Sequence, residues 1–190
     1  KNIAPTFGGI NLEDIKAPES FEIERRLVEE LNIPVMHDDQ HGTAIISSAA
    51  LINALELADK KAEDVKMVVS GAGSAAIACA DLYVLLGVKR ENILMFNSKG
   101  LLTKDNPALS ELQLKYAIDG AKISLEESLK GADIFLGLST ANVMTPEMLL
   151  AMADNPIVFA MANPDPEIAY NLAISTRKDV IMATGRSDHP

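Results

Sequence analysis

The chain has 190 residues, of which 48% are hydrophobic and 23% charged, so it is long and apolar enough for one domain with a full core, and disordered and fibrous proteins are excluded. Its formal net charge of −10 argues against nucleic acid or a membrane surface as a partner, because anionic surfaces repel an acidic chain. The single cysteine, Cys79, excludes an internal disulfide and favours a cytoplasmic protein; its small, apolar neighbours predict a buried residue and not a nucleophile.

The chain begins with Lys1 and not with Met, so we interpret residue 1 as a fragment boundary. Residues 1–9 lack the apolar stretch of a signal peptide. The pattern of residues 18–31 predicts a helix that begins at Pro18. Residues 42–55 form a weakly charged run that is too short to span a bilayer, and we predict a buried helix there.

Adjacent acids end two apolar runs in this first part of the chain. Glu13 and Asp14 end the segment 7–15, and Asp38 and Asp39 follow residues 33–37. Acids at the end of a buried strand need compensation by a cation or by hydrogen bonds. Three oxygen donors from two strand ends suit Mg²⁺ or Mn²⁺. We therefore predict that residues 1–44 are a metal-binding segment at a domain junction.

From residue 65 onward, short apolar runs alternate with helical patterns. Five runs, 65–70, 93–97, 134–138, 157–161 and 180–183, are short enough to be strands buried on both sides. The clearest helices are 74–86 and 145–153; Thr145 and Pro146 give the second helix an N-cap followed by proline. Residues 45–190 are thus predicted to be an α/β domain, a Rossmann-like doubly wound parallel sheet with helices on both faces.

Small or polar residues follow every one of these runs. They are Gly71, Asn97-Ser98, Ser139-Thr140, Asn163 and Gly185, in chain order. In an open parallel sheet the ligand crevice lies outside the carboxyl ends of the strands. These exits are therefore expected to converge on one binding site.

A glycine loop, Gly71-Ala72-Gly73-Ser74-Ala75-Ala76, follows the first run and opens the helix after it. In this setting the first glycine permits a tight turn, the second admits a pyrophosphate to the backbone, and the small Ala76 lets helix and strand pack closely. The helix amides and dipole then face the phosphates. The pattern predicts a dinucleotide site, NAD or NADP; a glycine turn that binds nothing is the alternative.

The second run ends in Asn97, where NAD-binding proteins of this architecture usually carry an acid for the ribose 2′-hydroxyl. Asn97 would not repel a 2′-phosphate, and Lys99 could pair with one. Lysines after strands are commonly solvated, so NADP is only mildly favoured.

The acid segments and the glycine loop closely resemble those of bacterial malic enzymes. The resemblance extends to Asn97-Ser98-Lys99-Gly100, to Met161-Ala162-Asn163-Pro164 and to residues 183–188. It implies that Glu13, Asp14 and Asp39 are metal ligands, that Asp38 pairs with a catalytic lysine, and that Asn163 lies near nicotinamide and substrate. The full set of predicted cofactor contacts is Asp39, Thr43, Gly71, Ala72, Gly73, Ser74, Ala75, Asn97, Lys99, Ser139 and Asn163.

By the same resemblance, the reaction is metal-dependent oxidative decarboxylation of malate to pyruvate and CO₂ with reduction of NAD(P)⁺. Malic enzymes take their catalytic tyrosine and lysine from a preceding domain, so residues 1–190 are expected to be inactive alone. The resemblance also implies a homodimer or a higher homo-oligomer for the full-length protein.

Two alternatives stay open at this point. His37 and Asp39, with His41 or His189, could form a facial iron site, but the glycine loop would then be unexplained; hydrogen-bonded histidines flanking the acids are the simpler interpretation. The chain could also be a nucleotide-binding module without catalysis of its own.

Overall fold

The structure is a computed structural model that describes residues 1–16, 19–120 and 122–186. All five predicted strands are present, with bounds that differ by two residues or fewer from the prediction. They are β3 (Met67–Ser70), β4 (Ile93–Asn97), β6 (Ile134–Gly137), β7 (Ile157–Ala160) and β8 (Ile181–Thr184). They pair in parallel and, with the edge strand β5 (Gly100–Leu101), form one sheet of order β5-β4-β3-β6-β7-β8. The predicted Rossmann-like fold is confirmed.

Both faces of this sheet are buried, because successive strand residues belong to different cores. Met67 and Val69 of β3 lie in a core with residues of α2 (Thr43–Leu57) and α3 (Ser74–Leu85), whereas Val68 lies in a second core. That second core contains residues of α5 (Leu125–Leu129), α6 (Pro146–Leu150) and α7 (Tyr170–Thr176). Such two-sided burial explains why the strands are continuous apolar runs.

The edge strand β5 (Gly100–Leu101) was not predicted and runs antiparallel to β4. Asn97 pairs with Gly100, so Ser98 and Lys99 form a two-residue hairpin loop, and Gly100 has φ +113°. The short elements α4 (Glu111–Leu114), α5 and the 3₁₀ turns Ala4–Thr6 and Arg90–Asn92 were not predicted either. They are too short for a period of 3.6 residues to be visible.

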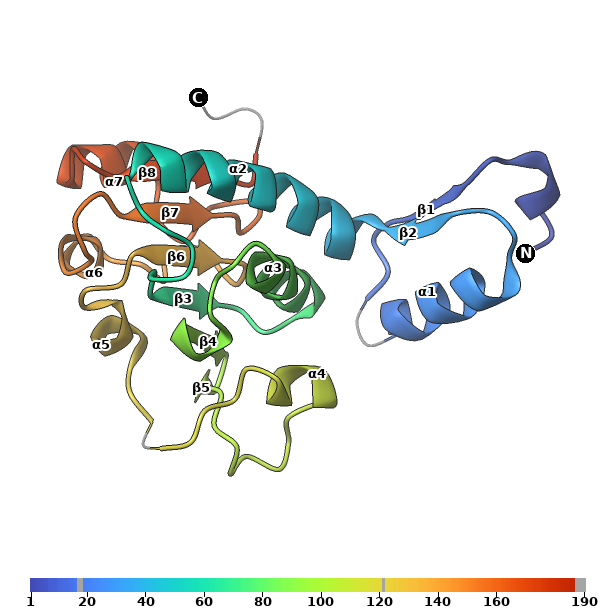
Figure 1. Cartoon of the computed structure of the whole chain (residues 1–190), viewed down its shortest axis with the longest axis horizontal. Coiled ribbons are helices and arrows are strands. Elements are labelled where there is room, and N and C mark those ends of the chain that lie inside the picture. Colours follow the sequence, from blue (N-terminus) through green and yellow to red (C-terminus); the bar gives the residue numbers. More distant parts are fainter. Residues whose placement is uncertain (17–18, 121, 187–190) are drawn as a thin grey trace.

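The N-terminal part forms a separate small unit of β1 (Ile10–Leu12), α1 (Glu19–Glu30) and β2 (Val35–His37), with β1 and β2 parallel. Figure 1 shows that this unit lies on the side toward which the arrows of β3, β6 and β7 point. Pro18, the predicted start of α1, is outside the described residues. The predicted division after residue 44 falls inside α2, which continues from this unit onto the sheet.

The prediction of a buried helix at residues 42–55 was wrong for one face of α2. Leu51 is fully buried, but Ile46 and Ile52 are 68% and 52% exposed. A weakly charged run cannot reveal how many sides of a helix are covered, and α2 is covered on one side, by α3 and the sheet. None of the helices in the described part of the chain has both the length and the apolar content that a membrane span requires.

Candidate functional site

The glycine loop joins β3 to α3 at the centre of the sheet, where the parallel strand β4 lies on one side of β3 and the parallel strand β6 lies on the other. Gly71 has φ +124°, and a Cβ there would stand 2.4 Å from the carbonyl oxygen of Leu138. A Cβ on Gly73 would meet nothing within 4 Å. The loop therefore needs its first glycine for the turn and leaves open space at the second, which fits a pyrophosphate at the helix N-terminus.

A cleft of about 640 Å³ opens beside this loop and is lined by the exits of three strands. It holds Ser70 to Gly73 after β3, Phe96 to Ser98 and Gly100 from the β4–β5 hairpin, and Ser139 and Thr140 after β6. The backbone N–H of Lys99 donates to Oδ1 of Asn97 over 2.8 Å, so this oxygen is held by the hairpin. Lys99 is exposed and is not among the lining residues.

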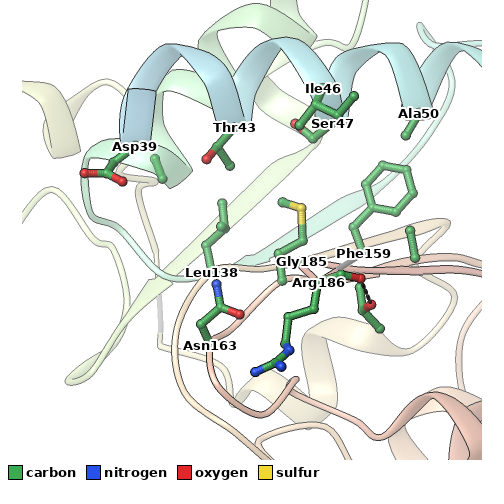
Figure 2. A pocket seen from close by; sticks show the side chains of 14 residues that line it. Asp39, Thr43, Ile46, Ser47, Ala50, Leu138, Phe159, Asn163, Gly185 and Arg186 are labelled. Carbon is green, nitrogen blue, oxygen red and sulfur yellow. Dashed lines mark hydrogen bonds between the residues drawn. The ribbon is translucent and has the colours of Figure 1, made fainter. Parts of the chain in front are cut away.

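A second pocket, of about 510 Å³, lies between α2 and the exits of β6, β7 and β8. Figure 2 shows Asp39, Thr43, Ile46, Ser47 and Ala50 along α2 and the turn before it, facing Leu138, Phe159, Asn163, Gly185 and Arg186. Ala75, in the first turn of α3, also lines this pocket. Leu138 lines this pocket and its neighbour Ser139 lines the cleft, so both cavities border the exit of β6.

The acid pair sits in a π-helical turn, Asp38–Gly42, between β2 and α2. Because β1 and β2 are parallel, their ends lie side by side, and the backbone N–H of Asp14 donates to Oδ2 of Asp39 over 3.0 Å. A Cβ on Gly42 would stand 2.3 Å from Oδ1 of Asp38, so the Asp38 carboxylate packs against this glycine.

Glu24 of α1 holds this turn through contacts with His37, Gln40 and His41. Its Oε1 accepts from the backbone N–H of His37 at 2.9 Å and lies 2.9 Å from Nε2 of His41, and its Oε2 accepts from Gln40. His41 thus pairs with a carboxylate beside the acids, as the simpler interpretation expects. For His37 the expectation of a hydrogen-bonded side chain was wrong: the residue is buried, neither ring nitrogen has a hydrogen-bond partner, and Nε2 lies 3.8 Å from Oδ2 of Asp39. Sequence reasoning missed Glu24, because no sequence pattern links this residue to a turn 13 or more positions further along the chain.

The predicted residues fall into four groups. Asp39, Thr43, Ala75 and Asn163 line the pocket, and Gly71, Ala72, Gly73, Asn97 and Ser139 line the cleft. Ser74 begins α3 and, with Ala72 and Gly73, lines a further cavity between α1 and α4. The fourth group, Glu13, Asp14, Asp38 and Lys99, lines neither the pocket nor the cleft. The roles of all these residues stay predictions.

The metal site stays a prediction. The contact between Asp14 and Asp39 joins a backbone N–H to a carboxylate, and no group of three or more His, Cys, Asp or Glu among the described residues is placed to hold a metal ion. Glu13 directly precedes Asp14, whose backbone lies in the left-handed region with φ +56°. His189, named in the iron alternative, lies outside the described residues.

Sequence reasoning also overlooked Arg186 and Glu167 as site residues. Arg186 lines the pocket on the side opposite α2 (Figure 2). Thr140, one of the strand-exit residues expected at the site, lines the cleft. Glu167 is fully buried below the strand exits, and the only hint was its place in a proline-rich loop, Asn163-Pro164-Asp165-Pro166-Glu167, where the Asn163–Pro164 bond is cis.

Several pKa values in the described part of the chain are shifted, and among them the hydrogen bond to Arg177 lowers the pKa of the exposed Asp179 to about 2. Burial raises the pKa of the Cys79 thiol to about 11, and Ser47 Oγ donates to its sulfur over 3.4 Å. Burial likewise raises the pKa of Tyr83, and burial with the bond to Asp81 raises the pKa of Tyr116. The expectation that Cys79 is buried is confirmed.

Comparison with known proteins places this geometry in a family. Residues 40–188 match the family model of the malic enzyme NAD-binding domain. The chain is 55% identical over 188 residues to an NADP-dependent malic enzyme of Halomonas elongata and 54% identical to an NAD-dependent malic enzyme of Rhizobium meliloti. It covers 99% of its own length in both matches, but only 44% and 24% of theirs.

The crystal structure of an NAD-dependent malic enzyme from Thermotoga maritima superposes with a TM-score of 0.91 at 47% identity, over 100% of this chain and 51% of that one. The chain therefore spans about half or less of the length of the proteins that it matches. The family match and these two levels of similarity show that the chain belongs to the malic enzyme family, as its NAD-binding domain.

Proposed function

We propose that this chain holds the dinucleotide and the metal of a malic enzyme that oxidises malate and releases pyruvate and CO₂. The observation that carries the proposal is that both cavities border the exit of β6: Ser139 lines the cleft at the glycine loop, and its neighbour Leu138 lines the pocket beside Asp39. A dinucleotide lying across both would have its adenosine half at the β4–β5 hairpin and its nicotinamide half near Asn163.

The metal part of the proposal assigns Mg²⁺ or Mn²⁺ to Asp14, Asp39 and Glu13. Its support is the contact of Asp14 with Asp39 at one edge of the pocket. When bound, a divalent cation supplies a Lewis acid for the oxygen on the substrate's reacting carbon. Asp38, packed on Gly42 beside Asp39, is proposed to orient a lysine supplied by another part of the full-length protein.

A small dicarboxylic acid suits the polar end of the pocket. Asn163 offers an amide, and the described lining residues include one cation, the guanidinium of Arg186. Guanidinium groups match carboxylates in geometry as well as in charge. Thr43 and Ser47 of α2 add hydroxyl groups, while Phe159, Met161 and Leu138 exclude water.

The deciding assay is malate-dependent formation of NADH or NADPH by the full-length protein with Mn²⁺. We expect turnover that stops when the metal is chelated. Absence of turnover with either cofactor, in a protein shown to be folded, contradicts the proposed reaction. Measuring both cofactors in one experiment also settles their order of preference, which the differently named relatives leave open.

A nucleotide-binding module is the second candidate for residues 1–190 alone. Among the described residues that line the pocket, Asp39 is the single side chain able to accept a proton as a carboxylate, and none is Lys, Tyr or His. Malate oxidation needs a positioned base and acid. We therefore expect the 190-residue chain to bind NAD(P)⁺ without oxidising malate; clear turnover by this chain would contradict the assignment of the proton-transfer groups.

The homo-oligomer and the cytoplasmic location remain part of this proposal. They are supported by the malic enzyme family and by the acidic, cysteine-poor composition. Light scattering of the full-length protein tests the first, and a monomer at working concentration would contradict it.

A further inference from the structure

Glu167 is a fully buried acid held by neutral groups. Its Oε1 accepts from the backbone N–H of Ser139 at 2.9 Å and from the Ser139 hydroxyl at 3.4 Å, and its Oε2 accepts from the backbone N–H of Ala162 at 3.0 Å. Burial of an ionised carboxylate is costly unless its oxygens are hydrogen-bonded. A residue that serves only to fill space at this position would be apolar.

The two residues that Glu167 holds are the exits of neighbouring strands. Ser139 follows β6 and lines the cleft, and Ala162 follows β7 and directly precedes Asn163, which lines the pocket. One carboxylate thus joins the loops of both cavities. The contact continues to a third strand, because the hydroxyl oxygens of Ser139 and Ser70 lie 2.8 Å apart at the end of β3.

The sheet leaves room for this carboxylate at one place. Gly137, the last residue of β6, lies directly beside it: a Cβ there would stand 2.3 Å from the carboxyl carbon of Glu167 and within 2.7 Å of both its oxygens. Gly137 itself does not line the cleft or the pocket. A glycine at this point in a buried strand indicates a close approach of another group.

We propose that Glu167 is a positioning residue that holds the exits of β6 and β7 at a fixed spacing, so that the two halves of the dinucleotide site stay aligned. The inference rests on the proposed function, since it assumes a dinucleotide across both cavities. Groups that bind or react need supporting hydrogen bonds to hold their geometry. Glu167 supplies these bonds without contacting the cofactor.

The test compares two amide substitutions at opposite ends of β6 in the full-length protein. Glu167→Gln turns one acceptor oxygen into an N–H₂ that faces a backbone N–H. Asp133→Asn is the matched control: Asp133 precedes β6, pairs with Lys60 and accepts from the backbone N–H of Lys66 at 2.8 Å, far from both cavities. Both changes remove a negative charge from a hydrogen-bonded site at the sheet.

The dissociation constants for NADH and NADPH, measured by fluorescence, and the Tm of each variant are the readouts. Glu167→Gln should raise the dissociation constant of the preferred cofactor roughly tenfold, whereas Asp133→Asn should lower the Tm without changing the affinity. Unchanged affinity in folded Glu167→Gln overturns the inference, as does equal weakening in both variants.

If Glu167→Gln does not fold, Gly137→Ala carries the same test. It keeps the charge but forces the carboxylate away, so the same loss of affinity supports the inference, and wild-type affinity overturns it. A wild-type protein that binds neither dinucleotide overturns the proposed function and this inference together. Wild-type binding with an unaffected Glu167→Gln overturns the inference alone.

Discussion

The backbone N–H of Asp14 donates a hydrogen bond to Oδ2 of Asp39, across 25 positions in the sequence. The contact exists because β1 and β2 are parallel, so the acids that follow Leu12 and His37 leave the small sheet at the same edge. Their place beside the pocket links the N-terminal unit to the strand exits of the large sheet.

Asp39→Ala is expected to reduce metal-dependent turnover of the full-length protein more than about 100-fold, since loss of a ligand costs at least as much as loss of a group that orients one. The Asp39 side chain is 44% exposed, so the Tm should change little. Mn²⁺ affinity and malate turnover are the measurements. The exposed loop acid Asp105 gives the control, Asp105→Ala, and equal activity in the two variants would exclude Asp39 as a ligand.

The two glycines of the loop should respond differently to alanine. Gly71→Ala places a methyl group against the carbonyl of Leu138 at φ +124°, and we expect a loss of about 2 kcal/mol in the free energy of unfolding and a fall of roughly 4–8 °C in Tm. Gly73→Ala should keep the wild-type Tm and weaken dinucleotide binding, because its methyl group enters open space at the loop. Urea unfolding and cofactor titration separate the two effects; wild-type affinity in Gly73→Ala would contradict a phosphate at this loop.

Asn97→Asp should move cofactor preference toward NAD. The substitution keeps the acceptor for the backbone N–H of Lys99 but adds a negative charge at the end of β4, which repels a 2′-phosphate. We expect kcat/KM with NADP⁺ to fall roughly tenfold and the value with NAD⁺ to hold. Lys99→Ala serves as the comparison, with a smaller fall for NADP⁺. An equal fall with both cofactors would show that the hairpin does not contact the 2′ position.

Stability should fall at alkaline pH through Cys79. Its pKa is about 11 in the folded chain against an ordinary 9.0, so the stabilisation is present below pH 9 and is lost as pH rises toward 11. Between pH 8 and pH 10 this group alone removes about 1 kcal/mol from the free energy of unfolding.

Urea titrations at pH 8 and pH 10 measure the loss, and Cys79→Ala should lose less over that interval. Tyr83 and Tyr116 have raised pKa values in both proteins, so their contributions cancel in the comparison. Identical pH dependence of the two proteins would show that the thiol ionises normally in the fold.

The sequence by itself determined the strands of the large sheet. Burial on both sides requires apolar runs, and each run ends where small or polar residues begin. It also determined the glycine loop, whose residue types follow from local geometry: only glycine takes φ +124° at Gly71 without strain. The helix start at Thr145 was equally local, and its hydroxyl accepts from the backbone N–H of Met148.

Only the tertiary structure decided which of these features meet. Glu24 supports the acid turn from another helix, Glu167 joins two strand exits, and one side of α2 is uncovered. The first two are contacts between separate segments of the chain, and the third is the absence of a covering segment. Residue type and local period carry no record of either. The sequence named Asp39 and Asn163 as site residues, but it took the packing of α2 against the strand ends to bring them to one pocket.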